Sequence, residues 1–117
     1  MATAVRLQNE MTTFIQLQIT YPNHEEAIEV AKRLVASKLA ACAQIVGGVE
    51  SCYVWKGEFC VDGETLLLCK TRSKLFDLVV KEITNTHSYE CPQIVAVPLT
   101  HVSPDYAVWL DDNIASI

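Results

Sequence analysis

The sequence lacks the long apolar segments of membrane and secreted proteins. Its 117 residues contain no apolar run of about 18 residues, the length that a transmembrane helix needs. Residues 1–11 also lack the apolar stretch of a signal peptide. We therefore expect a cytoplasmic protein that does not span a membrane.

A concentrated basic surface is missing as well. The formal net charge is −5 and the pI is near 5.0, whereas nucleic-acid surfaces usually carry clustered Lys and Arg. Beyond the N-terminal segment, the basic residues are spread along the chain: Lys32, Arg33, Lys38, Lys56, Lys70, Arg72, Lys74 and Lys81. We expect them to lie on solvated faces, with no nucleic acid as a partner.

Familiar catalytic and metal-binding motifs are also absent. The chain has no GxSxG, phosphate-binding loop or HExxH segment. Its five cysteines include no CxxC pair, which argues against a zinc ribbon or a thioredoxin-like site. They are Cys42, Cys52, Cys60, Cys69 and Cys91. In a cytosolic protein we expect such residues to act mainly as small buried hydrophobes.

The composition is that of one globular domain. Half of the residues are apolar and 20% are charged, in a chain too short for two domains of ordinary size. We predict a flexible segment over residues 1–11 and a single domain over 12–117. The apolar fraction is high for so small a domain, which suggests burial against another subunit.

The first half of the domain predicts a strand, a helix and a hairpin. Residues 12–20 alternate in the manner of a strand with one apolar face. Asn23 and Glu26 then have the spacing of a helix-capping box, and the apolar stripe predicts a helix to about Ala40. A strand over 43–55 carries a Gly pair typical of a bulge. Its hairpin turn falls at Lys56-Gly57-Glu58 or at Asp62-Gly63, before a return strand over 65–71.

The second half predicts a helix, a strand and a final helix. Ser73 can cap a helix whose apolar stripe ends near Ile83. A strand follows over 94–99, and Ser103-Pro104-Asp105 begins a C-terminal helix. The order indicates an α+β, ferredoxin-like βαββαβ antiparallel sheet with a C-terminal helix. Both main helices would cover one face, so a partner subunit is the simplest cover for the other.

Five segments, in order, resemble the CutA divalent-cation tolerance family. They are KLAACA at 38–43, YVWKG at 53–57, ETLLLCKT at 64–71, HSYECP at 87–92 and YAVWL at 106–110. The resemblance covers about residues 12–114. It implies a ferredoxin-like fold assembled as a homotrimer, similar to the PII-type signalling proteins, and a role in divalent-metal tolerance, copper in particular. Animal relatives are linked to acetylcholinesterase anchoring, and the family implies no settled enzymatic activity.

Copper favours imidazole and thiolate ligands, and the chain offers few of them. The candidate ligands are His24, His87, His101 and Cys91. The resemblance maps the ligands proposed in bacterial members to Ile19, Thr86 and His87, so one of three is kept. We predict His87 and Cys91 as ligands of Cu²⁺ or another divalent cation. Alternatively, His87 makes a structural hydrogen bond.

A second candidate is a small-ligand site in a cleft between subunits. Mixed donors, acceptors and charges would line it: Lys70, His87, Tyr89, Glu90 and Glu64. The alternative is a buried polar network that only stabilises the assembly. We expect the aromatic residues to form the trimer interface: Tyr53, Trp55, Tyr106 and Trp109.

Three functions compete at this point. The leading hypothesis is a trimeric cytosolic binding or regulatory protein for divalent-cation tolerance. The second is a trimeric scaffold for protein–protein interaction that has no small-ligand site. The third is a hydrolase or redox enzyme that uses Cys91 and His87, and we expect no enzyme because nothing in the sequence pairs the two.

Overall fold

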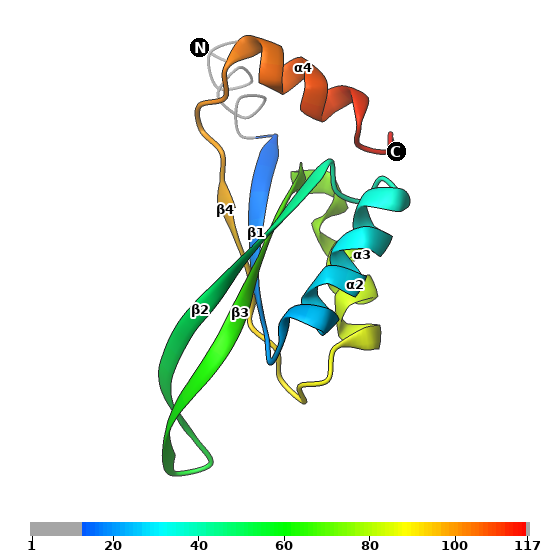
Figure 1. Ribbon diagram of the computed structural model, residues 1–117. Helices are drawn as coiled ribbons and strands as arrows, with labels where there is room; N and C mark the ends of the chain where they lie inside the picture. Colours follow the sequence, from blue (N-terminus) through cyan, green and yellow to red (C-terminus); the bar gives the residue numbers. More distant parts are fainter. Residues whose placement is uncertain (1–12, 117) are drawn as a thin grey trace.

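The computed structural model describes residues 13–116 and shows a four-stranded antiparallel sheet with its main helices on one side (Figure 1). The elements are β1 (Phe14–Tyr21), α2 (His24–Ala36), β2 (Cys42–Trp55), β3 (Glu58–Arg72), a 3₁₀ turn (Ser73–Leu75), α3 (Phe76–Thr86), β4 (Ile94–Pro98) and α4 (Pro104–Asp112). The strand order β2-β3-β1-β4 is that of the predicted ferredoxin-like α+β fold, which is thereby confirmed. The predicted flexible segment, residues 1–11, lies outside the described residues.

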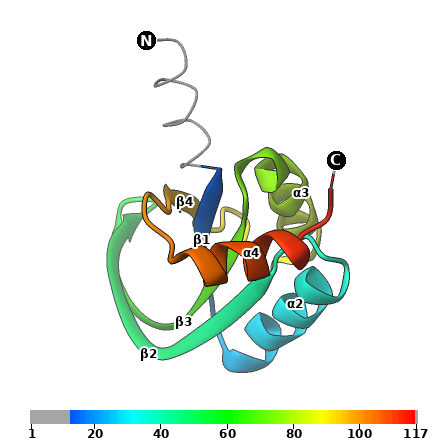
Figure 2. The ribbon, with the colours of Figure 1, turned by 90° about the horizontal axis from the view of Figure 1, so that it is seen from above.

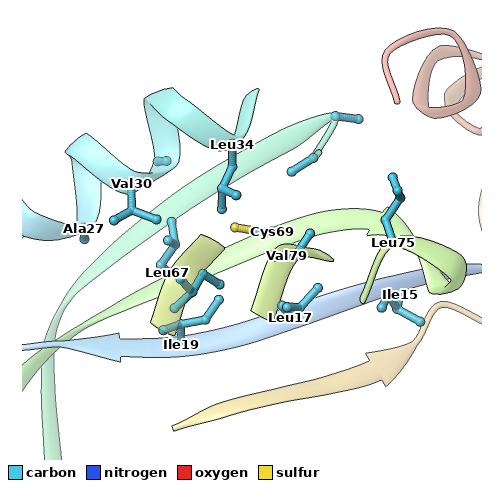
Figure 3. Close-up of a cluster of buried hydrophobic side chains, with 14 of the residues drawn as sticks. Ile15, Leu17, Ile19, Ala27, Val30, Leu34, Leu67, Cys69, Leu75 and Val79 are labelled. Atoms are coloured by element: carbon cyan, nitrogen blue, oxygen red, sulfur yellow. The ribbon is translucent and has the colours of Figure 1, made fainter. Parts of the chain in front are cut away.

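The core lies between the sheet and helices α2 and α3. Alternate side chains of β1, with Leu67 and Cys69 of β3, point toward α2 and α3, as a period of two requires. Figure 3 shows Ile15, Leu17 and Ile19 of β1 in this layer. None of the helices in the described part of the chain lies over the opposite face (Figures 1 and 2), and Val46, Val95 and Val97 are exposed there.

Helix α2 begins as predicted and ends earlier. The Asn23 side chain accepts a 2.8 Å hydrogen bond from the Glu26 backbone N–H, which confirms the cap. The helix ends at Ala36 rather than Ala40, because Lys38 takes a left-handed φ of 63° that turns the chain toward the sheet. The N–H groups of both Leu39 and Ala40 then bond to the carbonyl of Leu34.

The hairpin of β2 and β3 uses the first of the two predicted turns. Lys56 and Gly57 connect the strands with φ values of 50° and 82°, the left-handed pair of a type I′ turn. Gly63 lies inside β3, which starts at Glu58 rather than at residue 65. The predicted bulge is present as a register shift between residues 46 and 49. The result is a long, twisted hairpin that extends beyond the rest of the sheet (Figures 1 and 2).

Other local expectations need correction. Ser73 makes no side-chain cap, and its backbone N–H bonds instead to the Thr13 carbonyl at 2.6 Å. All five cysteines are free, but only Cys69 is buried, while Cys52 and Cys91 are exposed. Within residues 13–116, no helix is long and apolar enough to cross a membrane.

Candidate ligand pocket

His87 connects the segment after α3 to the end of β1 through hydrogen bonds of its imidazole ring. Its side chain is completely buried, and its Nε2 lies 2.7 Å from the Thr20 carbonyl oxygen. Because a carbonyl can only accept, Nε2 carries the proton. Its Nδ1 accepts a 3.0 Å hydrogen bond from the Tyr89 backbone N–H. The imidazole is therefore neutral, with both nitrogens engaged.

Two rings and one carboxylate surround this imidazole. Tyr21 stacks on it at 4.3 Å between centroids and 15° between planes, and Tyr89 lies tilted at 4.8 Å. A Glu26 carboxylate oxygen is 3.8 Å from Nδ1 and accepts a 3.0 Å hydrogen bond from the Ser88 N–H. Glu26 thus binds the loop instead of closing the predicted capping box.

Two phenol–carboxylate pairs lie here: one joins the loop to the hairpin, and the other joins the two strands of the hairpin. The Tyr89 hydroxyl donates to Glu64 at 2.8 Å, and the Tyr53 hydroxyl donates to Asp62. Burial first, and then the Glu64 carboxylate, raise the pKa of Tyr89 above its usual range. The hydrogen bond to Asp62, with a smaller contribution from burial, raises the pKa of Tyr53 to about 12. Both phenols are therefore protonated donors at neutral pH.

A pocket of about 510 Å³ lies between this loop and the hairpin. Its lining residues are Thr20, Ser51, Cys52, Tyr53, Trp55, Glu64, Tyr89, Glu90, Cys91 and Gln93. Two of them are carboxylates and none is a Lys, Arg or His. At the rim, the Lys56 ammonium lies 3.8 Å from a Glu90 oxygen and 5.7 Å from the centre of the Trp55 ring.

The structure gathers most of the predicted ligand residues, though not all. Glu64, Tyr89 and Glu90 line the pocket, and His87 lies behind it as the support of Tyr89. Lys70 does not line the pocket. It is six residues beyond Glu64 on β3, about 20 Å along the strand, and its ammonium donates to Gln44 at 2.9 Å.

The metal pair predicted from His87 and Cys91 is not assembled as a ligand set within one chain. Copper would need an imidazole nitrogen, and both are occupied by backbone partners. No group of three or more His, Cys, Asp or Glu side chains suited to a metal ion occurs in residues 13–116. For the same reason, neither ring nitrogen of His87 is available to act as a base for Cys91. The metal assignment stays a prediction that this geometry does not favour.

The predicted interface aromatics form two separate groups in one chain. Tyr53 and Trp55 lie on the hairpin beside the pocket, exposed by 40% and 42%. Tyr106 and Trp109 lie on α4, where their rings stack at 5.5 Å. Burial, with Cys42 nearby, raises the pKa of Tyr106. All four remain predicted interface residues.

Several site residues carried no usable sequence signal. Tyr21 and Thr20 belong to a strand end, and Ser51, Cys52 and Gln93 follow no motif. The spacing of Glu26 from Asn23 predicted a capping box, but the Glu26 carboxylate binds the Ser88 N–H instead.

The family model for the CutA1 divalent ion tolerance protein matches residues 15–113. "Divalent-cation tolerance protein CutA" of Thermus thermophilus is 42% identical over 95 residues, covering 81% of this chain and 92% of that protein. "Protein CutA, chloroplastic" of Arabidopsis thaliana is 35% identical over 114 residues, covering 96% of this chain. The chain spans only 63% of that plant relative's length.

The same family appears among solved structures. CutA1 of Oryza sativa superposes with a TM-score of 0.87 at 34% identity, covering 91% of this chain and 97% of that one. The Thermus thermophilus protein gives 0.84 at 39% identity, with 87% and 99% covered. An Archaeoglobus fulgidus relative, described as periplasmic, gives 0.84 at 35% identity, with 87% and 99% covered.

Proposed function

Since the chain belongs to the CutA1 divalent ion tolerance family, we propose that it is a trimeric binding protein that supports tolerance of divalent cations, copper among them. In this proposal the pocket between hairpin and loop is the ligand site, and the protein is not an enzyme. We propose that the protein acts in the cytoplasm, since five free thiols suit a reducing compartment.

The observation that carries the proposal is how firmly the pocket wall is held. His87 ties the loop to β1, Glu26 ties Ser88 to α2, and Tyr89 reaches Glu64 on β3. A site whose walls are fixed beforehand loses less entropy on binding. A purely structural loop does not need an open pocket of this size, which falls within the range of small-ligand sites.

The trimer is proposed from surface that one chain leaves uncovered. On one side of the hairpin Val54, Phe59 and Val61 are exposed by 65%, 73% and 55%. The sheet face without helices adds exposed valines. The three hairpin side chains share one face, with Val54 paired directly to Phe59, and an exposed apolar patch of this kind marks an interaction site. A homotrimer is what the family resemblance implies.

In this proposal the protein supports copper tolerance, but His87 is not a copper ligand. The buried ring would have to give up the Thr20 carbonyl or the Tyr89 N–H before it could bind a metal. Copper titration followed by calorimetry should therefore give the same stoichiometry for the wild type and for His87→Gln, provided that both are folded. A copper site lost only in His87→Gln would restore the imidazole as a ligand.

A growth assay tests the proposed function. Cells that depend on this protein for growth in elevated copper should lose tolerance with Tyr89→Phe or Glu64→Gln, which remove one phenol–carboxylate bond. Glu29→Gln, an exposed change on α2, is the control for charge. Full tolerance in both pocket variants would refute the ligand-site proposal.

The scaffold remains the second candidate, because the exposed hairpin surface serves it equally well. It requires tolerance to be lost with hairpin-surface variants and kept with pocket variants. The same assay therefore separates the two functions.

A further inference from the structure

We infer that the pocket between hairpin and loop binds an organic cation, a primary ammonium group carried on an apolar carbon chain. The inference rests on the proposed function, which makes this pocket the ligand site, and it names the chemical class of the ligand.

Charge is the first argument. The lining contains Glu64 and Glu90 and no cationic side chain, and Asp62 lies next to it through its bond to Tyr53. The phenols of Tyr89 and Tyr53 donate to two of these carboxylates, which leaves each carboxylate with further acceptor sites. The wall therefore presents acceptors and negative charge, which excludes anions and suits a donor cation.

Aromatic surface is the second argument. Trp55, Tyr53 and Tyr89 form part of the lining, and the faces of such rings attract ammonium and guanidinium groups. Carboxylates combined with aromatic rings bind the charged head and the apolar carbons of an organic cation together. A metal ion needs oxygen, nitrogen or sulfur ligands, which aromatic rings do not supply.

The chain itself shows such a group held at the rim. The ammonium of Lys56 lies between the Trp55 ring, 5.7 Å away, and Glu90, 3.8 Å away. The Lys56 and Glu90 side chains are 71% and 76% exposed, so this contact is weak and a ligand can displace it. Lys56 thus marks the position and chemistry of the cation that the pocket would take.

The size and ligand set argue against a divalent metal as the occupant. A volume of about 510 Å³ far exceeds the space that one ion fills. Hard divalent cations need about six oxygen ligands, and residues 13–116 contain no group of even three suitable side chains.

Trp55 provides a direct probe. The chain has two tryptophans, so Trp109→Phe leaves Trp55 as the single reporter. Titration with n-butylammonium should change its emission in a saturable way, and 1-butanol, the neutral analogue, should not. Glu90→Gln and Glu64→Gln should weaken n-butylammonium binding by about tenfold, and Glu29→Gln should not. Equal binding of the alcohol, or affinity that both pocket variants leave unchanged, would overturn the inference.

A pair of lysine variants tests the role of the rim. Lys56→Met removes the internal competitor and should tighten n-butylammonium binding several-fold. Lys38→Met is the matched control, because Lys38 also has a left-handed φ, carries the same charge and follows the end of α2, outside the residues that line the pocket. Equal affinities for the two variants would show that Lys56 does not mimic the ligand and would overturn the inference.

Failure here can be told apart from failure of the proposed function. If n-butylammonium does not bind while Tyr89→Phe still abolishes copper tolerance, the ligand class is wrong and the ligand site stands. If Tyr89→Phe and Glu64→Gln both keep full tolerance, the proposed function is wrong whatever the fluorescence shows.

Discussion

At the scale of single residues, the imidazole of His87 connects β1 to the loop that forms the pocket wall. His87→Ala leaves the Thr20 carbonyl and the Tyr89 N–H without their partner, and a buried unpaired group costs about 1–3 kcal/mol. We expect the free energy of unfolding to fall by about 2–4 kcal/mol in urea denaturation. His101→Ala is the control, because that side chain is exposed and its Nδ1 pairs with the neighbouring Thr100 hydroxyl at 2.9 Å. Similar losses in the two variants would contradict the connecting role.

The raised pKa of Tyr53 predicts a change of stability in alkaline solution. Its pKa is about 12 in the folded protein and about 10 in an unfolded chain. The contribution of this group to stability is therefore complete below pH 10 and is lost as the pH rises through 12. Asp62→Asn removes the main cause of the shift. We expect Tyr53 to ionise at lower pH in this variant, seen by absorbance at 295 nm, and stability to depend less on pH between 10 and 12.

An unchanged ionisation curve in Asp62→Asn would show that the carboxylate does not hold the Tyr53 proton. The other three tyrosines serve as an internal reference, because Asp62 is not the main cause of any of their shifts.

The site could be predicted by residue type and only partly by partner. Tyr89, Glu64 and Glu90 were predicted to line a cleft between subunits. One chain already brings them together in a pocket, and the part of a second subunit stays a prediction. The partners of His87 are backbone atoms, which the residue types do not reveal. The sequence therefore left two roles open for His87, a metal ligand and a structural hydrogen bond. Lys70 could not be placed, because its distance from Glu64 depends on how far β3 continues as one strand.

At the scale of elements, the Gly pair in β2 provides a matched test of backbone conformation. Gly48 has a φ of 74° and Gly47 does not lie in the left-handed region, and an added Cβ would meet nothing within 4 Å at either position. Strain alone then distinguishes the two. Gly48→Ala should lower the free energy of unfolding by about 1–2 kcal/mol. Gly47→Ala should leave it unchanged or raise it slightly.

Both values come from urea denaturation of the purified variants. Equal effects at the two positions would mean that the bulge does not depend on the left-handed conformation of Gly48.

Local signals predicted the elements well and their ends less well. The alternation of β1, the Asn23 cap and the bulge each arise from neighbours in sequence, and each was confirmed. The start of β3 was wrong by seven residues, because residues 58–64 mix polar and apolar types and contain a second turn signal. Pairing with β2 decides that segment, and such pairing is not local.

At the scale of the whole molecule, the extended hairpin is difficult to explain in an isolated chain. In Figure 1 its outer part packs on none of the helices within residues 13–116, yet it carries Val54 and Phe59 on directly paired positions. A two-stranded ribbon alone is only marginally stable in water. Contact with another copy would cover these side chains and hold the ribbon, which links the shape of the hairpin to the proposed trimer.

The final prediction therefore concerns the mass of the assembly. Light scattering should give about three times the 13.0 kDa of one chain for the wild type, and about one chain mass for Phe59→Lys combined with Val61→Lys. Both side chains are more than half exposed in a single chain, so the substitutions should leave each chain folded, as circular dichroism can check. Leu78→Lys is the control, because it replaces an exposed apolar side chain on α3, within the helical layer. A wild-type monomer would refute the trimer, and a double variant that stays trimeric would place the subunit contacts away from the hairpin.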